Sequence, residues 1–325
     1  MKIDLQEHWG NKELFHVPRL VSKIVQGMQT DGHVHLWTKE GKNGNNNGLY
    51  RLLDELCAYW GWNKSNITIS TCAVNNSFMT SEYKNRWMDY GQSGVDFKPT
   101  FPIYPWNKEK IYGMFIGRAD CSRIRAIHSH MNFRYKHHGL TSFHQDLFEY
   151  MSYPDLVQYF MESGQTYEQM ISVKPYSDID SIKTPPITPG NDGINWGKVY
   201  QKIAIDVVCE TSTEPDSWDA SEKVFRCFYY KRPFLLIGSP GNLEYLNSYG
   251  HKTWKGIIPE DYDCLEGIAR VDRVFEILDQ LITENKFEEI LEKSQDILEH
   301  NHKLFLKNRE RWSKQNFERL VDGEE

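Results

Sequence analysis

Apolar residues follow two alternating patterns along the chain: short continuous runs between turn residues, and longer stretches with helical spacing. Strands are expected at the short runs, which are residues 33–38, 67–72, 111–116, 204–208 and 234–237. Amphipathic helices are expected at the longer stretches, which are residues 49–60, 122–130, 223–230, 271–281 and 287–317. A strand, a loop and a helix in succession form the unit of a parallel sheet, so the pattern predicts an α/β fold.

The predicted strands and helices fall into two groups along the chain. An aromatic, proline-bearing stretch at 97–106 continues neither pattern and is typical of a connection. We therefore expect a boundary near Lys108–Lys110, with one α/β domain at 1–109 and a second at 110–325 that ends in helices. The chain of 325 residues is long enough for two domains of ordinary size.

Composition narrows the class of protein. Aromatic residues make up 14% of the chain, which is typical of a folded protein. The chain has no run of about eighteen apolar residues and its first residues lack a signal-peptide core, so we expect a soluble, cytoplasmic protein. The cysteines include no Cys-x-x-Cys pair, which disfavours a structural zinc site or a disulfide framework.

The charge is distributed unevenly. The net charge is -7, but residues 1–110 hold 13 Lys and Arg against 11 Asp and Glu, and the remainder holds 25 against 34. The acidic total therefore does not exclude a neutral-to-basic face on the first domain. The most basic local segment could hold a diphosphate or a polyanion, or could be spread around a solvated helix. Its cations are Arg118, Arg123, Arg125, Arg134 and Lys136.

The most informative chemistry lies between residues 210 and 250. A predicted strand leads into Glu210, a helix begins at Ser221-Glu222-Lys223, and a second strand ends at Gly238. A carboxylate can accept hydrogen bonds from two ribose hydroxyls, and a lysine ammonium can bind a diphosphate. The helix N-terminus adds partial positive charge at the same place. The segment therefore predicts a sugar-nucleotide site, and hence an enzyme.

The same residues carry a resemblance to a known family. The matching motifs are Phe115-Ile116-Gly117-Arg118, Glu210-Thr211-Ser212, Ser221-Glu222-Lys223-Val224-Phe225, Lys231-Arg232-Pro233-Phe234 and Leu243-Glu244-Tyr245-Leu246. They resemble the C-terminal half of GT-B glycosyltransferases, closest to the fucosyltransferase-like group and to similar proteins of bacteriophages and large viruses. The likeness covers residues 110–280, whereas the N-terminal part is similar only in its general layout.

This resemblance implies a specific architecture. It implies two Rossmann-like domains with an interdomain cleft and a C-terminal helical segment that crosses back to the first domain. It also implies a nucleotide sugar as co-substrate, with no cofactor and no metal, because GT-B enzymes usually use cationic side chains instead. A virus-encoded protein of this kind would act in the host cytoplasm.

Donor-site residues can be assigned to roles in this chemistry. Arg118 and Lys223 each follow a predicted strand and are expected to stabilise the leaving diphosphate, and Glu222 is expected on the ribose. A surface arginine and an ordinary helix-start acid are the alternatives. Glu210 and Ser212 could line the nucleotide or orient Lys223, or could instead cap the following loop. The remaining donor-side candidates are Ser221, at the start of the helix, and Trp218, which could take the base-contacting role that the resemblance implies for an aromatic residue of this loop.

Acceptor-side residues are expected in the glycine-bearing loop that follows the first-domain strand. Glu40 is the candidate catalytic base because it comes directly after that strand, and a solvated loop glutamate is the alternative. Its neighbours Lys42, Asn43 and Gly44 are expected to contact the acceptor, since glycines permit close backbone approach. Asp31 is the second candidate for the base.

Histidines raise the possibility of a metal site. His33 and His35 lie two apart on a predicted strand and could point the same way, and His128 and His130 have the same spacing. No cysteine or carboxylate stands at complementary spacing, while zinc needs three or four protein ligands. We therefore expect no metal.

The combined interpretation is a glycosyltransferase that moves a sugar from a nucleoside-diphosphate sugar to an acceptor hydroxyl. A glycan is the expected acceptor, and a hydroxymethylated base of phage DNA is the alternative. A nucleotide-sugar-binding or carbohydrate-binding protein without catalysis is a further alternative. A nicotinamide dehydrogenase is disfavoured because no Gly-x-Gly-x-x-Gly follows a strand. No residue pattern in the sequence identifies the transferred sugar, the nucleotide base, the stereochemical outcome or the oligomeric state.

Overall fold

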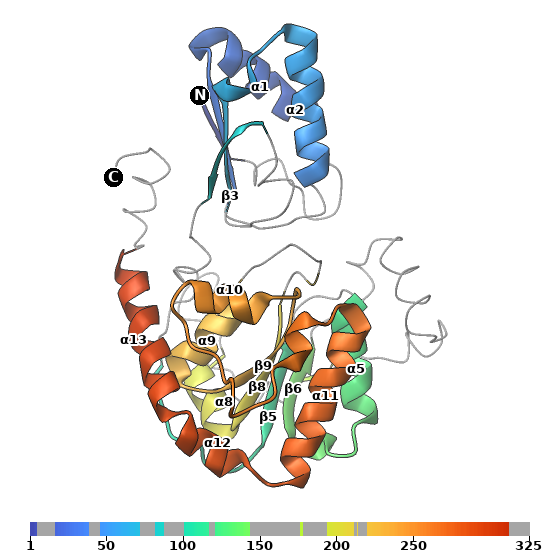
Figure 1. Ribbon diagram of the computed structural model, residues 1–325, viewed down its shortest axis with the longest axis vertical. Helices are drawn as coiled ribbons and strands as arrows, with labels where there is room; N and C mark the ends of the chain where they lie inside the picture. Colours follow the sequence, from blue (N-terminus) through green and yellow to red (C-terminus); the bar gives the residue numbers. More distant parts are fainter. Residues whose placement is uncertain are drawn as a thin grey trace. The chain divides into compact units, whose positions relative to one another are not determined.

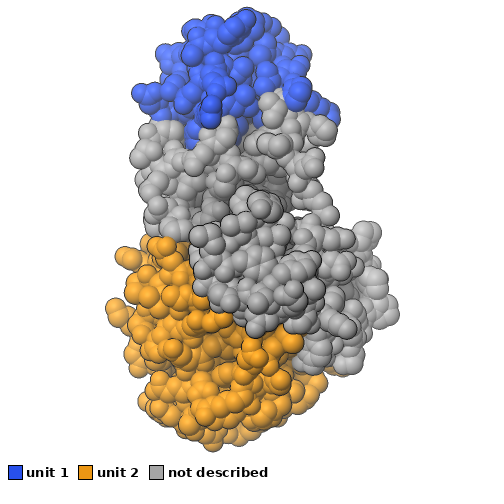
Figure 2. Space-filling view, turned by 90° about the vertical axis from the view of Figure 1, so that its right-hand side faces the viewer, with its two compact units in different colours: residues 1–95, 214–219, 308–325 blue, residues 96–213, 220–307 orange. Residues whose placement is uncertain are grey.

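The structure is a computed structural model. In it the chain forms two compact units. Unit 1 comprises residues 1–95, 214–219 and 308–325, and unit 2 comprises residues 96–213 and 220–307 (Figure 2). The domain limits expected from the sequence, 1–109 and 110–325, stay a prediction. The structure describes residues 1–4, 17–38, 46–71, 82–87, 101–116, 121–143, 176–177, 194–210, 213 and 220–311.

Unit 1 contains a parallel four-stranded sheet whose strands follow one another in chain order. The strands are β1 (Lys2–Asp4), β2 (Val34–Thr38), β3 (Ile67–Thr71) and β4 (Lys84–Trp87). Helix α1 (Val17–Asp31) connects β1 to β2, and helix α2 (Asn46–Trp60) with the short helix η2 (Lys64–Asn66) connects β2 to β3 (Figure 1). Both connections advance in the same direction across the sheet, and connections between parallel strands are right-handed. Helices α1 and α2 therefore lie on the same face of the sheet.

The core of unit 1 explains why its helices form where they do. On α2, Leu49, Leu53 and Cys57 recur every four residues and are buried, so this helix presents one apolar stripe to the sheet. On β2, Val34 and Leu36 are buried in the same cluster. The apolar residues that predict these helices and strands from the sequence are therefore the ones buried in the core of this unit.

Unit 2 contains a five-stranded sheet with a reversal in strand order. The order is β7 (Tyr176–Ser177), β6 (Gly139–Phe143), β5 (Tyr112–Ile116), β8 (Ile205–Cys209) and β9 (Phe234–Ile237). All neighbouring pairs are parallel except β6 and β7, which are antiparallel. The chain moves from β5 to β6 in one direction and from β8 to β9 in the other, so the switch point lies between β5 and β8. Ligands of open α/β sheets bind at the carboxyl ends of the strands at such a point.

Helices cover both faces of this sheet (Figure 1). Helix α11 packs against α5 and β9, whereas α9 packs against β8. The helices are α5 (Cys121–Asn132), α8 (Trp196–Lys202), α9 (Glu222–Tyr230), α10 (Asn242–Ser248), α11 (Gly267–Thr283), α12 (Phe287–Lys293) and α13 (Gln295–Arg311), with the short helices η3 (Lys136–His138) and η5 (Asp261–Cys264). Every residue of β5, β8 and β9 is buried, which is why these strands appear in the sequence as continuous apolar runs.

The segment after α9 is held by a buried arginine. Lys231 ends the helix in a left-handed conformation with φ 54°, and Pro233 prevents its continuation. Arg232 is 5% exposed, and burial lowers its pKa to about 10. It donates hydrogen bonds to the main-chain carbonyls of Tyr104, Tyr200, Ile203, Tyr230 and Lys231. The Arg-Pro pair of the resemblance motif is therefore structural here.

The α/β class with two Rossmann-like sheets, expected from the sequence, is confirmed by these parallel sheets. The helix predicted at 287–317 is divided at Ser294 into α12 and α13, and its residues after Arg311 lie outside the described part. None of the described helices is both long enough and apolar enough to span a membrane.

Candidate functional site

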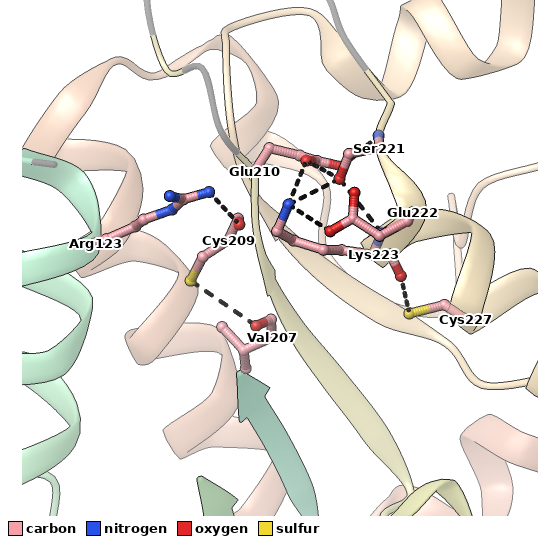
Figure 3. Close-up of polar contacts among 8 residues, drawn as sticks. All are labelled: Arg123, Val207, Cys209, Glu210, Ser221, Glu222, Lys223 and Cys227. Carbon is pink, nitrogen blue, oxygen red and sulfur yellow. Dashed lines mark hydrogen bonds and ion pairs between the residues drawn. The ribbon is translucent and has the colours of Figure 1, made fainter. Parts of the chain in front are cut away.

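A cluster of charged and hydroxyl side chains lies at the carboxyl end of β8, beside the switch point (Figure 3). Glu210 follows β8 directly and is fully buried, and its main-chain NH donates to the Ile237 carbonyl at 2.8 Å. Its carboxylate accepts two hydrogen bonds from Ser221, from the main-chain NH at 2.9 Å and from the hydroxyl at 2.5 Å. These bonds join the end of β8 to the start of α9.

Ser221 is the N-cap of α9. Its backbone is extended, with φ -95° and ψ -178°, and its hydroxyl oxygen accepts a hydrogen bond from the Lys223 main-chain NH at 3.3 Å. The same oxygen accepts a hydrogen bond from Lys223 Nζ at 3.0 Å. The Glu210 carboxylate thus fixes the cap, and the cap fixes the lysine.

Lys223 lies between two carboxylates. Its Nζ is 3.1 Å from Glu222 Oε1 and 3.7 Å from Glu210 Oε2. The Lys223 side chain is 13% exposed, whereas the Glu222 side chain is 45% exposed. The cluster therefore has one inner carboxylate that is enclosed by the protein and one outer carboxylate that faces solvent.

The outer carboxylate is ionised at any ordinary pH. Partial burial raises the pKa of Glu222, but the positive charges of Lys223 and Arg226 and the Lys223 hydrogen bond lower it to about 2. Arg226 lies one turn further along α9, and its guanidinium stacks over the Trp196 ring at 3.9 Å from the centroid. A carboxylate held ionised in this way is a strong hydrogen-bond acceptor for ligand hydroxyls.

A second cation reaches the same end of β8 from the other side of the switch point. Arg123, on the first turn of α5, is 3% exposed, and its Nη2 donates to the Cys209 carbonyl at 3.2 Å (Figure 3). In the sequence this arginine is only one member of the basic segment. The sequence does not distinguish it from Arg125 on the same helix, because the contact with Cys209 that places it here joins residues far apart in the chain.

Two other arginines of the basic segment form ion pairs within the fold. Arg125 makes two hydrogen bonds of 2.8 Å to the Asp272 carboxylate, and Arg134 pairs with Asp279. Both acids lie on α11, which packs against α5. The basic patch considered from the sequence therefore does not form from these two side chains, because each guanidinium is bound to a carboxylate within the fold.

The structure brings together Glu210, Ser221, Glu222 and Lys223 of the predicted donor-side residues. Of the other predicted site residues, only Asp31 belongs to the described part of the chain; the rest lie outside it, and their roles stay predictions. They are Glu40, Lys42, Asn43, Gly44, Arg118, Ser212 and Trp218.

Asp31 lies at the end of α1 and is half exposed. Its carboxylate pairs with the Met1 amino group at 2.7 Å, which lowers its pKa. Because α1 leads into the amino end of β2, Asp31 lies at the amino edge of the sheet.

Three of the four paired histidines contact hydroxyl groups within the fold. His33 and His35 contact Thr68 Oγ1 at 2.9 Å and Ser70 Oγ at 2.6 Å on the neighbouring strand β3. His130 Nδ1 lies 2.7 Å from the Tyr112 hydroxyl. Among the described residues, no group of three or more histidine, cysteine or acidic side chains is arranged to hold a metal ion.

No family model and no curated protein matches the chain. Two solved structures show a likeness to it. One is the DNA-modifying enzyme beta-glucosyltransferase in the presence and absence of the substrate uridine diphosphoglucose, with 13% identity, 89% of this chain and 74% of that chain covered, and a TM-score of 0.38. The other is T4 phage BGT in complex with UDP and Mn2+, with 11% identity, the same coverage and a TM-score of 0.41. Such scores do not establish a shared fold, so the function proposed below rests on the site.

Proposed function

We propose that the protein is a glycosyltransferase that uses a nucleoside-diphosphate sugar as donor. The observation that carries this proposal is the Glu210, Ser221, Glu222 and Lys223 cluster at the N-terminus of α9, beside the switch point of a doubly wound sheet. A diphosphate needs positive charge, and a ribose needs an acceptor for its hydroxyls. The cluster supplies both within one turn of helix.

Each side chain of the cluster takes a distinct role. Lys223 and the α9 N-terminus stabilise the charge that grows on the leaving diphosphate. Glu222 accepts hydrogen bonds from the ribose hydroxyls, because it is the more exposed carboxylate and is ionised. Glu210 is a positioning residue, since it holds the Ser221 cap that in turn holds Lys223. Arg123 adds positive charge at the same end of β8.

The remaining roles rest on the sequence. Glu40 is proposed to take the proton from the acceptor hydroxyl, and Arg118 to bind the diphosphate beside Lys223. Direct attack by the deprotonated hydroxyl inverts the anomeric centre. The lysine ammonium takes the part that a divalent ion plays in metal-dependent transferases, so we propose a metal-independent reaction.

A glycan is the first proposed acceptor, and a hydroxymethylated DNA base is the second. The observation that favours DNA is the charge split, since residues 1–110 are slightly basic although the chain is acidic. Transfer assays with labelled nucleotide sugars decide between them, using oligosaccharides in one arm and duplexes that contain 5-hydroxymethylcytosine in the other. Labelled duplex without labelled glycan supports the DNA acceptor.

The donor site is tested by isothermal titration with UDP, GDP, CMP and dTDP and their common sugars. We expect one nucleoside diphosphate to bind, and Lys223→Ala to weaken that binding. Lys303→Ala, which removes an exposed lysine on α13, is the matched control and leaves binding unchanged. Absence of binding by every nucleotide would overturn the proposed function. Binding without transfer to any acceptor would instead indicate a non-catalytic nucleotide-sugar-binding protein.

A further inference from the structure

Three aromatic side chains lie together at the C-terminal end of α2 in unit 1. Tyr59 is 81% exposed and Trp60 is 46% exposed, the two highest values among the large apolar side chains of the described residues. The Tyr59 ring meets Trp60 edge-on at 5.3 Å, and Trp60 stacks on Trp62 at 5.8 Å with 11° between the ring planes. We call Tyr59, Trp60 and Trp62 the aromatic platform.

The backbone fixes this arrangement. Gly61 ends α2 in the left-handed region with φ 65°, and the Trp62 main-chain NH donates to the Cys57 carbonyl at 3.0 Å, as in a Schellman motif. The reversed chain places Trp62 against the core of unit 1, and Trp60 lies on its outer side. The aromatic platform is therefore preorganised, and a ligand need not order it.

The platform shares no residue with the candidate donor site. It belongs to unit 1, whereas the described donor-site residues belong to unit 2. Helix α2 leads into the amino end of β3 through η2, so the platform lies at the amino edge of its own sheet.

Charge around the platform disfavours an anionic ligand. The cations of α2 and η2 are both paired, Arg51 with Glu55 at 3.2 Å, and Lys64 with Asp54 at 2.8 Å. Lys64 also pairs with Glu82 at 2.7 Å. The C-terminus of α2 adds partial negative charge. Single-stranded nucleic acid needs cations beside its stacking rings, so the platform suits an uncharged ligand better.

The size of the platform points to a small ligand. One aromatic side chain buries about 150–250 Å² on contact, so two partly exposed rings fall well short of the roughly 800 Å² that each partner of a stable protein complex buries. Sugar rings match this footprint, because their C–H faces pack on aromatic rings. We propose that the aromatic platform is a binding site for an uncharged oligosaccharide, independent of the donor site.

The test is titration of the full chain with maltohexaose, cellohexaose and chitohexaose, followed by tryptophan fluorescence and calorimetry. We expect at least one hexasaccharide to bind, and Tyr59→Ala and Trp60→Ala each to weaken it about tenfold. Both side chains are exposed, so neither variant threatens folding. Met131→Ala, which removes another exposed apolar side chain, leaves binding unchanged, as does Lys223→Ala in the donor site.

Several outcomes would overturn the proposal. Failure of all hexasaccharides to bind would do so, as would binding that Tyr59→Ala and Trp60→Ala do not alter. Binding of a single-stranded oligonucleotide in place of the saccharides would assign the platform to nucleic acid. A dimer that dissociates in Tyr59→Ala would assign it to a second copy of the chain. Because Lys223→Ala separates the two sites, failure here leaves the proposed glycosyltransferase untouched.

Discussion

Unit 2 encloses charged side chains in two different ways. Arg232 and Arg270 are buried, and their guanidinium groups donate chiefly to main-chain carbonyls, with one bond from Arg270 to the Asp263 carboxylate. Lys223 and Glu222 are instead held by side chains at the end of a strand, and Glu222 stays 45% exposed. The first arrangement joins segments that are distant in the sequence. The second presents charge where ligands of such sheets bind.

The comparison teaches how a structural charge differs from a functional one in this fold. A guanidinium saturated by backbone carbonyls cannot leave them without exposing several buried acceptors. A lysine paired with a solvent-facing carboxylate can exchange that partner for a phosphate at little cost. Substitutions should therefore affect stability in the first region and ligand binding in the second.

The largest expected effect is the loss of stability on removal of the buried Arg232 side chain. Arg232→Ala leaves five main-chain carbonyls without their donor and should lower the free energy of unfolding by about 3 kcal/mol. Urea denaturation measures this change, with Lys303→Ala as a surface control. Equal stability of the two variants would contradict the structural role of Arg232.

On the functional side, Lys223→Ala should weaken binding of the nucleoside diphosphate by about 2 kcal/mol, or about thirtyfold, because a charge-assisted contact to phosphate is lost. Its effect on unfolding should be smaller than that of Arg232→Ala, since the buried Glu210 carboxylate keeps both hydrogen bonds from Ser221. Calorimetric titration and urea denaturation of the same samples measure both quantities. A large loss of stability without a loss of binding would place Lys223 with the structural arginines.

A buried histidine provides a third case, in which a titratable group has no polar partner. His251 stacks on Phe228 at 4.4 Å, and neither ring nitrogen has a hydrogen-bond partner among the described residues. Burial, together with the charge of His300, lowers its pKa to about 3. The unfolded chain therefore binds the proton first, and the free energy of unfolding should fall below pH 6.5 by up to about 1.4 kcal/mol per pH unit.

His251→Phe keeps the stack on Phe228 and removes the titration, so it should flatten this acid dependence. Thermal denaturation of both proteins between neutral and acidic pH tests the prediction. Parallel pH profiles for the two proteins would show that another group controls the acid sensitivity.

Substitution of Glu222 is expected to change the free energy of unfolding least. Its pKa is lowered to about 2, so its pairing stabilises the fold above the unfolded value near 4.3 and is lost only as the pH falls toward 2. Glu222→Gln should change the free energy of unfolding at neutral pH by less than about 1 kcal/mol, because the side chain is about half exposed. Donor binding should weaken more than stability does. Titration with the nucleoside diphosphate and with its 2′,3′-dideoxy analogue isolates the contact between Glu222 and the ribose hydroxyls.

Much of the fold was predictable from the sequence because buried parallel strands are continuous apolar runs and helices have apolar stripes. The division between α12 and α13 was not predictable, since neither glycine nor proline marks Ser294. Glu210, Glu222 and Lys223 were predictable as a group because they follow β8 and begin α9. The role of Arg232 was not, because its carbonyl partners come from segments as distant as Tyr104. The position of Arg123 depends likewise on a contact with Cys209 that no local pattern encodes.

The most direct measurement is a double-mutant cycle on donor binding with Glu210→Gln, Lys223→Ala and the double variant. If Glu210 acts by positioning Lys223 through Ser221, each single variant weakens nucleotide binding, and Glu210→Gln causes little further loss once Lys223 is absent. Independent, additive losses would contradict positioning. Unchanged binding in all three variants would place the nucleotide elsewhere and remove the basis for the proposed donor site.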